Sequence, residues 1–466
     1  MNFQVVVLVG GASKTLTPLV SKDVPKALLP VANRPVLSYV LELLESNELK
    51  DLIVVVQGQD AAVKVGSWIS SAYADRLNVE VATVAEDLGT AGALRVVAPH
   101  LVANDVMVVS GDLVTDVSPG ALAAAHRRHD AVVTALLCPA PVSGASDSGA
   151  SGGKDKAKKQ VRYNIVGLDP TQQFLLLLAA GTEIEKDIRV QKSILRAAGQ
   201  MEIRADLMDA HLYAFKRSAL QEILVANEKF QSIRQDILPY LVRSQLRSEL
   251  SSNYQSDMEE SWHGKDTVQN IQTWRSQHQA GARLSFPDLH SLGFNDGNRK
   301  VNDHLPATRK SHKCCAYIAS KSTYCARVNS VQSFCDITRD VIGDSSHLSG
   351  YSFSLQNNII HPSAQLGIKT TVGPQCMLDE GSQLGDKCSV KRSVIGRHCR
   401  IGSNVKIVNS IVMNHVTIED GCLVQGSIVC SNVQLQEHAV LKDCQIGAGY
   451  VVTAGSEYKA ESFTKK

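Results

Sequence analysis

The sequence predicts an α/β domain with a mostly parallel sheet, followed by a left-handed parallel β-helix of hexapeptide repeats. Short β-branched runs alternate with helical stretches over the first 120 residues, which is typical of βαβ units. Aliphatic residues recur every six positions after Ile360, which indicates a repeat of short period. A polar stretch between these regions predicts that they fold as separate units.

The α/β pattern begins with the apolar run Val5 to Val9. The stretch from Val36 to Leu49 has apolar residues at helical spacing, so a helix is expected there. Strands separated by helices form parallel sheets covered on both faces, and ligands bind such sheets beyond the carboxyl ends of the strands. The other strands expected are Leu52 to Val56, Val79 to Val84 and Val106 to Val109.

Changes in composition divide the chain. Residues 1–243 are assigned to the α/β domain, which contains a Ser/Gly/Ala-rich stretch at 143–160 that is expected to be a mobile loop. The lysines at 154–159 could contact an acidic partner or simply be solvated. The remaining assignments are a partly disordered polar linker at 244–311, a connecting segment at 312–358, the β-helix at 359–455 and a tail at 456–466.

The C-terminal repeat has a period of 17 residues, so that Ile395, Val412, Val429 and Ile446 occupy equivalent positions in successive coils. An aliphatic residue opens each hexad, and a small residue four positions later is also expected to point inward. Glycines directly after aliphatic residues, such as Gly396, are expected at corners where φ is positive. The fourth-offset residues are Cys376, Ser382, Cys388, Cys399, Val405, Val416, Cys422, Val433 and Ala439.

The cysteines and histidines of the repeat are interpreted as structural. Four cysteines occupy core positions where small apolar side chains are expected, which argues against a metal site. Many hexapeptide β-helices are acyltransferases that need a histidine, and His398 and His415 are available. Both fall at outward-facing positions, which favours plain surface histidines over catalytic ones.

The composition argues against several classes of protein. The formal charge of +2 over 466 residues gives no basic excess of the kind that marks nucleic-acid binding. The N-terminus does not resemble a signal peptide, and no run reaches the roughly 18 apolar residues of a membrane span. We therefore expect a cytosolic protein without membrane or direct nucleic-acid contact. The 11 cysteines include no C-x-x-C pair and are expected to be reduced thiols.

Three motifs follow expected strands of the α/β domain. Gly10-Gly11 ends the first strand, where glycines let backbone amides approach a phosphate, and Lys26 could reach that phosphate. Gly89-Thr90-Ala91 and Ser110-Gly111-Asp112 complete the set. Together these motifs resemble those of the sugar-nucleotide pyrophosphorylases, which have a nucleotidyltransferase-like, Rossmann-like fold. The resemblance implies nucleotide binding by Gly10, Gly11, Gly89 and Thr90, phosphate binding by Lys26, and Mg²⁺ binding by Asp112.

The sequence departs from this family at its central loop, which runs Gly-Gly-x-Gly-Thr-Arg-Leu. Ser13 replaces the third glycine, and Thr15 stands at the position of the catalytic arginine. A neutral threonine cannot stabilise the charge that develops on a transferring phosphoryl group. Unless Lys14 replaces the arginine, the nucleotide pocket is predicted to be degenerate, so no catalytic residue, metal or cofactor is assigned.

Whether the carboxylates of this region bind a metal ion is left open by the sequence. A second metal-binding carboxylate would have to be Asp116 or Asp209. Asp112 itself could instead cap a turn at the end of its strand.

Six further stretches carry a second resemblance: 1–7, 24–35, 206–213, 232–242, 315–318 and 325–329. They are similar to the gamma subunits of translation initiation factor 2B, a eukaryotic guanine-nucleotide exchange factor. The resemblance implies a non-catalytic subunit that pairs with the epsilon subunit, joins the other subunits and promotes GDP-for-GTP exchange on translation initiation factor 2. The alternative is an active sugar-1-phosphate nucleotidyltransferase that makes GDP-mannose or a related product. By the same resemblance, 315–318 and 325–329 are expected to form the entry strand into the β-helix region.

Overall fold

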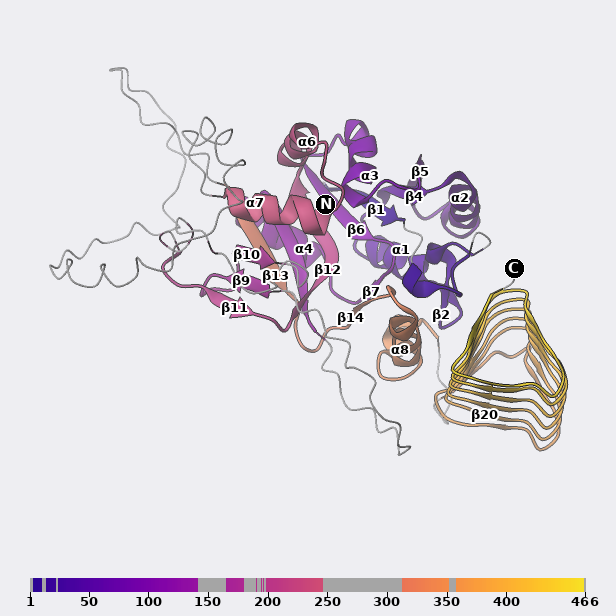
Figure 1. Ribbon diagram of the computed structural model, residues 1–466. Coiled ribbons are helices and arrows are strands. Elements are labelled where there is room, and N and C mark those ends of the chain that lie inside the picture. Colours follow the sequence, from indigo (N-terminus) through magenta and orange to yellow (C-terminus); the bar gives the residue numbers. More distant parts are fainter. Residues whose placement is uncertain are drawn as a thin grey trace, which may run out of the picture. The chain divides into compact units, whose positions relative to one another are not determined.

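The computed structural model describes residues 3–10, 14–21, 24–140, 165–179, 190, 194, 196, 198–245, 312–351 and 358–464. The expected loop at 143–160, with its lysines at 154–159, lies outside these residues. Most of the expected linker at 244–311 also lies outside them. No helix in the described ranges is long and apolar enough to cross a membrane. Six strands from the first 216 residues and one strand at Cys314–Ile318 form a sheet of seven strands flanked by helices (Figure 1).

This sheet confirms the expected α/β architecture. Its order is β13-β8-β12-β6-β1-β4-β5, and every neighbouring pair is parallel except the two that β12 makes with β6 and β8. The strands are β1 (Phe3–Val9), β4 (Asp51–Gln57), β5 (Asn78–Val84), β6 (Asp105–Ser110), β8 (Val133–Pro139), β12 (Leu207–Lys216) and β13 (Cys314–Ile318). Shorter strands are β2 (Pro30–Val31), β3 (Arg34–Pro35), β7 (Leu113–Thr115), β9 (Ile165–Leu168), β10 (Leu175–Ala179), β11 (Glu202–Arg204) and β14 (Cys325–Arg327).

Helices cover both faces of the sheet, because its strands are apolar on both sides. In β1, Val5 and Val7 belong to the hydrophobic core on one face, whereas Val6 belongs to the core on the other. The first core also contains residues of α1 (Val36–Ser46), α2 (Gln59–Tyr73) and α4 (Pro119–Arg128). The second contains residues of α3 (Thr90–Val97), α6 (Arg217–Ala226) and α7 (Leu238–Ser244).

The segment at 312–358 does more than connect two domains. Its strand β13 pairs in parallel with β8 at the edge of the large sheet, and β14 pairs antiparallel with β7. The expectation that these strands lead into the β-helix is therefore wrong, and the α/β domain does not end at residue 243. The physical reason is that Cys314 and Ala316 are buried in the core of the sheet, so β13 is stabilised by packing there.

The C-terminal region is the expected three-sided parallel β-helix (Figure 1). Equivalent residues of successive coils pair at the predicted interval, as Ile395 does with Val412 and Ile401 with Ile418. The inward-pointing cysteines and the other fourth-offset residues are buried, which confirms their assignment to the core. One side comprises β15 (Ile359–Ile360), β18 (Met377–Leu378), β21 (Val394–Ile395), β24 (Ile411–Val412), β27 (Ile428–Val429), β30 (Gln445–Ile446) and β33 (Ser462–Phe463). The second comprises β16 (Gln365–Leu366), β19 (Gln383–Leu384), β22 (Arg400–Ile401), β25 (Thr417–Ile418), β28 (Gln434–Leu435) and β31 (Val451–Val452). The third comprises β17 (Thr371–Val372), β20 (Ser389–Lys391), β23 (Lys406–Val408), β26 (Leu423–Gln425), β29 (Val440–Lys442) and β32 (Glu457–Lys459).

The corners of the β-helix differ from the prediction. Gly396 does not have positive φ. A Cβ at this position would lie 2.5 Å from the Oδ1 of Asn414 in the next coil, so the close stacking of the coils explains the glycine. Positive φ occurs instead at other corner residues, including His398 (52°) and His415 (57°). These two histidines are exposed, and their rings stack with centroids 5.3 Å apart, as expected of surface residues on adjacent coils.

The β-helix also extends beyond residue 455. Strands β32 and β33 pair with β29 and β30 and so add to two of the three sides. The expected boundary between β-helix and tail was too early. The aliphatic pattern weakens there because Tyr458 and Phe463 replace aliphatic residues and pack against the core of the helix.

One side of the β-helix packs against the α/β domain. We call its outward-pointing residues Met377, Val394, Ile411 and Ile428 the docking row; all four are buried in a hydrophobic cluster. The cluster includes Val31 of β2 and Phe334 of α8 (Val331–Ile342). The side-chain amide of Asn33 also donates a 3.0 Å hydrogen bond to the backbone oxygen of Ile395. The docking row thus joins the β-helix to the segment that follows the predicted nucleotide loop.

A buried histidine in the α/β domain predicts acid sensitivity. The Nδ1 of His126 lies 3.0 Å from the Oγ1 of Thr134, and burial lowers the pKa of His126 to about 4. Because the folded state holds this histidine neutral, its stabilising effect is present above pH 6.5 and is lost as the pH falls towards 4. In this window the wild type takes up as much as about one proton at His126 when it unfolds, and this uptake makes the unfolding free energy depend on pH. We expect His126→Gln to remove this part of the pH dependence, as measured by urea denaturation at several pH values. A pH dependence that stays the same in His126→Gln would contradict this prediction.

Candidate functional site

A cavity of about 970 Å³ lies beyond the carboxyl ends of β1, β4 and β6, where parallel sheets bind ligands. Gly10 follows β1 and Gly111 follows β6, so the sheet itself brings these two motifs together. Of the residues predicted to bind a nucleotide, the structure brings Gly10, Lys26, Gly89, Thr90 and Asp112 to this one cavity. Gly11 and Ser13 lie outside the described residues, as does the side chain of Lys14.

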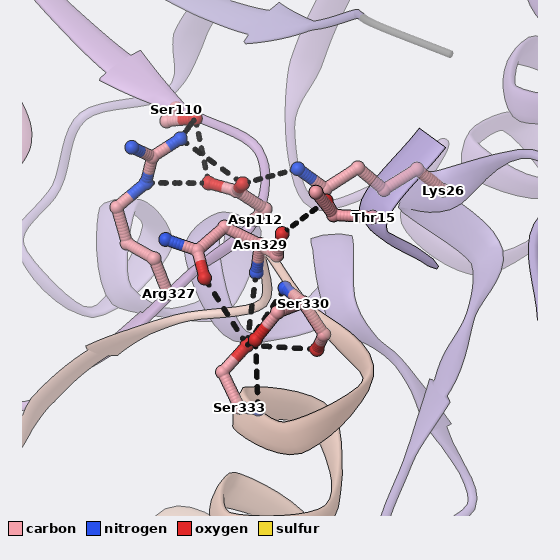
Figure 2. A network of polar contacts seen from close by, with 8 residues as sticks. All are labelled: Thr15, Lys26, Ser110, Asp112, Arg327, Asn329, Ser330 and Ser333. Atoms are coloured by element: carbon pink, nitrogen blue, oxygen red, sulfur yellow. Dashed lines mark hydrogen bonds and ion pairs between the residues drawn. The ribbon is translucent and has the colours of Figure 1, made fainter. Parts of the chain in front are cut away.

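The centre of the site is an ionic network around Asp112 (Figure 2). One carboxylate oxygen, Oδ2, accepts from the ammonium of Lys26 at 2.5 Å and from Nη2 of Arg327 at 3.0 Å. The other, Oδ1, accepts from Nε of Arg327 at 2.9 Å and from the hydroxyl of Ser110 at 2.7 Å. Arg327 therefore holds the carboxylate in a two-pronged pair, and Lys26 adds a second positive charge.

The network keeps Asp112 ionised. The Asp112 side chain is only 4% exposed, and burial alone would raise its pKa, but the charges of Arg327 and Lys26 and their hydrogen bonds hold the pKa well below its usual value. Its partners are side chains rather than the amides of a turn, so the turn-capping alternative is wrong. The structure assigns Asp112 to an ion-pair network.

Arg327 was missed in the sequence analysis. It lies on β14, and 215 positions separate it from Asp112. The available signal was its place in a short apolar stretch between Ala326 and Val328, because arginine is almost never buried unless it is paired.

Thr15, at the position of the expected catalytic arginine, is also bound internally. Its hydroxyl donates a 2.6 Å hydrogen bond to the backbone oxygen of Asn329, just before α8 (Figure 2). Helix α8 begins there with a reciprocal cap in which Ser330 and Ser333 each accept from the other's backbone amide. Thr15 thus ties the predicted nucleotide loop to the start of α8 through a neutral hydrogen bond.

The Gly-Thr-Ala motif is tied to a second loop. Gly89 lies so close to Gln231 that a Cβ would come within 2.2 Å of the Gln231 carbonyl oxygen. The amide of Ala91 donates to that oxygen at 2.9 Å, and the Thr90 hydroxyl accepts from the amide of Ile233 at 2.9 Å. Packing of these loops therefore accounts for the glycine and threonine without any ligand.

The carboxylates that could complete a metal site have other partners. Asp116 accepts from the amide of Tyr324 at 2.8 Å and lies 3.0 Å from the Nε2 of His347. Asp209 accepts from the amide of His211 at 2.8 Å and from the hydroxyl of Tyr213 at 2.6 Å.

The residues around Asp112 do not fit Mg²⁺. A carboxylate offers about four lone-pair sites, and the four hydrogen bonds to Asp112 occupy them. Two cations already adjoin this carboxylate and would repel a third. Within the described ranges, no group of three His, Cys, Asp or Glu side chains could hold a metal ion.

Two family models match the two parts of the chain. The model described as "Nucleotidyl transferase" matches residues 4–156, which include β4, β6 and all but the first residue of β1, with the loops that follow them at the cavity. The model described as "EIF2B subunit epsilon LbH domain" matches residues 356–458, in the β-helix. These matches confirm the predicted fold class, a nucleotidyltransferase domain followed by a left-handed β-helix.

Curated relatives extend the similarity over most of the chain. The chain is 30% identical over 415 residues to "Translation initiation factor eIF2B subunit gamma" of Dictyostelium discoideum, covering 86% of this chain and 88% of that protein. It is 26% identical over 397 residues to the protein of the same name from Schizosaccharomyces pombe, covering 84% and 74%. "Mannose-1-phosphate guanylyltransferase" of Mycobacterium tuberculosis is 32% identical over 132 residues, which is 28% of this chain and 36% of that enzyme. The chain therefore belongs to the gamma-subunit family of translation initiation factor eIF2B.

Proposed function

We propose that this chain is a non-catalytic subunit of eIF2B that pairs with the epsilon subunit and promotes GDP-for-GTP exchange on translation initiation factor 2 in the cytosol. Family membership makes it part of a multi-subunit assembly. The observation that carries the proposal is similarity to a gamma subunit over 86% of the chain, across both domains. A factor that promotes GDP release has to bind the partner more tightly in its nucleotide-poor state, so contact surfaces can suffice for this role.

The geometry around Asp112 supports the non-catalytic part of the proposal. Nucleotidyl transfer needs positive charge at the transferring phosphoryl group, and Thr15 offers none at the expected position. The Asp112 carboxylate, expected to bind Mg²⁺ in the pyrophosphorylases, is engaged with Lys26 and Arg327. The rival function, sugar-1-phosphate nucleotidyl transfer, rests on partial matches to guanylyltransferases, such as one that spans 28% of the chain.

We further infer that the cavity is a degenerate nucleotide pocket that still binds a phosphate-bearing ligand as a regulator. Gly10, Gly11, Lys26, Gly89, Thr90 and Asp112 are the residues we assign to it. Two observations support ligand binding: the cavity is open enough for a nucleotide at about 970 Å³, and both Lys26 and Arg327 line it.

The proposed role predicts which proteins accompany the chain in cells. Isolation of the tagged chain at moderate salt should recover an epsilon-like chain, further eIF2B subunits and translation initiation factor 2, identified by mass spectrometry. Untagged cells treated in the same way provide the control. The same preparation should release no pyrophosphate from GTP and mannose 1-phosphate. Recovery of the chain alone or only with copies of itself, together with pyrophosphate release, would establish the nucleotidyltransferase instead.

A further inference from the structure

The charged side chains that line the cavity, as far as the structure describes them, divide into an interior group and a rim. Lys26, Asp112 and Arg327 form the interior group, and their side chains are 17%, 4% and 19% exposed. One carboxylate against two cations leaves this group with one net positive charge. The carboxylates of Asp60, Glu86 and Asp87 also line the cavity, but these residues are solvent-exposed, so water and salt screen them.

The two interior cations keep unused hydrogen-bond donors. Lys26 and Arg327 approach the Asp112 carboxylate from opposite sides (Figure 2). Lys26 has three ammonium protons and donates to Asp112 alone among the described residues. Nε and Nη2 of Arg327 make its hydrogen bonds to Asp112 and Ser110, whereas Nη1 has no partner in the described part of the chain. Ammonium and guanidinium groups are the kinds of donor that bind phosphate oxygens in proteins.

We propose that Arg327 takes the place of a divalent metal ion in this pocket, so that a phosphate-bearing anion binds against Lys26 and Arg327 without Mg²⁺. The inference rests on the degenerate pocket proposed above. A metal ion bound to Asp112 would bridge that carboxylate to a phosphate. In this proposal the guanidinium forms the bridge, because it pairs with the carboxylate through Nε and Nη2, lines the cavity, and has Nη1 left over for a ligand. The site is then permanently charged, since arginine does not lose its proton in proteins.

Inorganic pyrophosphate tests the proposal on the purified full-length chain by isothermal titration calorimetry. We expect saturable binding in EDTA, and weaker binding in excess Mg²⁺ because the metal neutralises the free anion. Binding of Mn²⁺, followed by electron paramagnetic resonance, should be the same for the wild type and for Asp112→Asn. Binding of pyrophosphate only when Mg²⁺ is present, or no saturable binding at millimolar concentration, would overturn the proposal without the need for any variant.

Two variants predict changes of opposite sign. Arg327→Gln removes the proposed anion-binding charge and should weaken pyrophosphate binding about tenfold or more, since a tenfold loss corresponds to about 1.4 kcal/mol. Asp112→Asn keeps the shape of the side chain but removes the competing negative charge, so it should tighten binding. If Asp112 were a metal ligand, Asp112→Asn would instead abolish binding, and that result would contradict the proposal.

Circular dichroism and thermal melting establish whether each variant is folded. Arg204→Gln provides a matched control, because Arg204 makes a similar two-pronged pair with Asp206 and does not line the cavity. It should leave pyrophosphate binding unchanged. Because these titrations use the chain alone, they can fail while the partner isolation succeeds, so the two proposals are tested separately.

Discussion

Arg327→Met is expected to lower the free energy of unfolding by about 3 kcal/mol, the lower end of the range for breaking a buried ion pair. The reason is that Asp112 is almost wholly buried and would lose two of its four hydrogen bonds. Lys26 remains beside it, so the carboxylate keeps one counter-charge. Chemical denaturation at neutral pH, followed by circular dichroism, measures this change.

Arg204→Met is the matched control for this experiment. The Nε and Nη2 of Arg204 donate hydrogen bonds of 2.7 and 2.6 Å to the carboxylate of Asp206, but the Asp206 side chain is 61% exposed. Water can replace such a partner, so the control should cost less than about 1 kcal/mol. Equal losses for the two variants would mean that burial does not strengthen the Asp112 network.

The same pair predicts a dependence on pH. Because the folded state lowers the pKa of Asp112 below its ordinary value of 3.8, the stabilisation is present above that pH and is lost as the pH falls below it. The difference in stability between the wild type and Arg327→Met should therefore shrink below about pH 4. A difference that stays constant into the acid range would show that packing of the arginine, rather than its charge, carries the effect.

Ile411→Asp is expected to separate the β-helix from the α/β domain. Ile411 is 6% exposed within the docking row, and an unpaired carboxylate buried there would cost about 3–5 kcal/mol. Because Ile411 points away from the core of the β-helix, the coils themselves should remain folded. We expect two separate unfolding transitions in calorimetry and faster hydrogen exchange in α8.

Lys406→Asp is the control for Ile411→Asp. Lys406 occupies the corresponding outward position on another side of the same coil, where it is exposed. Its replacement adds a carboxylate to the same coil without burying it, so the stability should change by less than about 0.5 kcal/mol. A single cooperative transition in both variants would indicate that the docking row does not hold the two domains together.

The amino-acid sequence by itself determined the fold class and the coils of the β-helix. Each coil repeats the same local demands, an inward aliphatic residue and a small residue four positions later, so a period of 17 is visible without knowledge of any distant contact. The α/β pattern was visible for a similar reason, since strands such as β1 are apolar on both faces. The position of the cavity followed from the rule for parallel sheets.

A signal for the docking row was also present but was not interpreted. On that side of the β-helix both residues are apolar in the five strands β15, β18, β21, β24 and β27, as in Val394-Ile395 and Ile411-Val412. On another side an outward polar residue precedes the inward one in every strand except β31, as in Arg400-Ile401. Apolar residues on both faces of a strand indicate that both faces are buried, although they do not identify what covers the outer one.

Only the tertiary structure decided the chemistry around Asp112. Arg327 reaches that carboxylate from 215 positions away, through the pairing of β14 with β7, and no local period relates the two residues. The same holds for β13, whose place at the edge of the large sheet depends on pairing with β8. Periodicity reports which face of an element is buried, whereas the choice of partner across a long separation depends on how the whole chain packs.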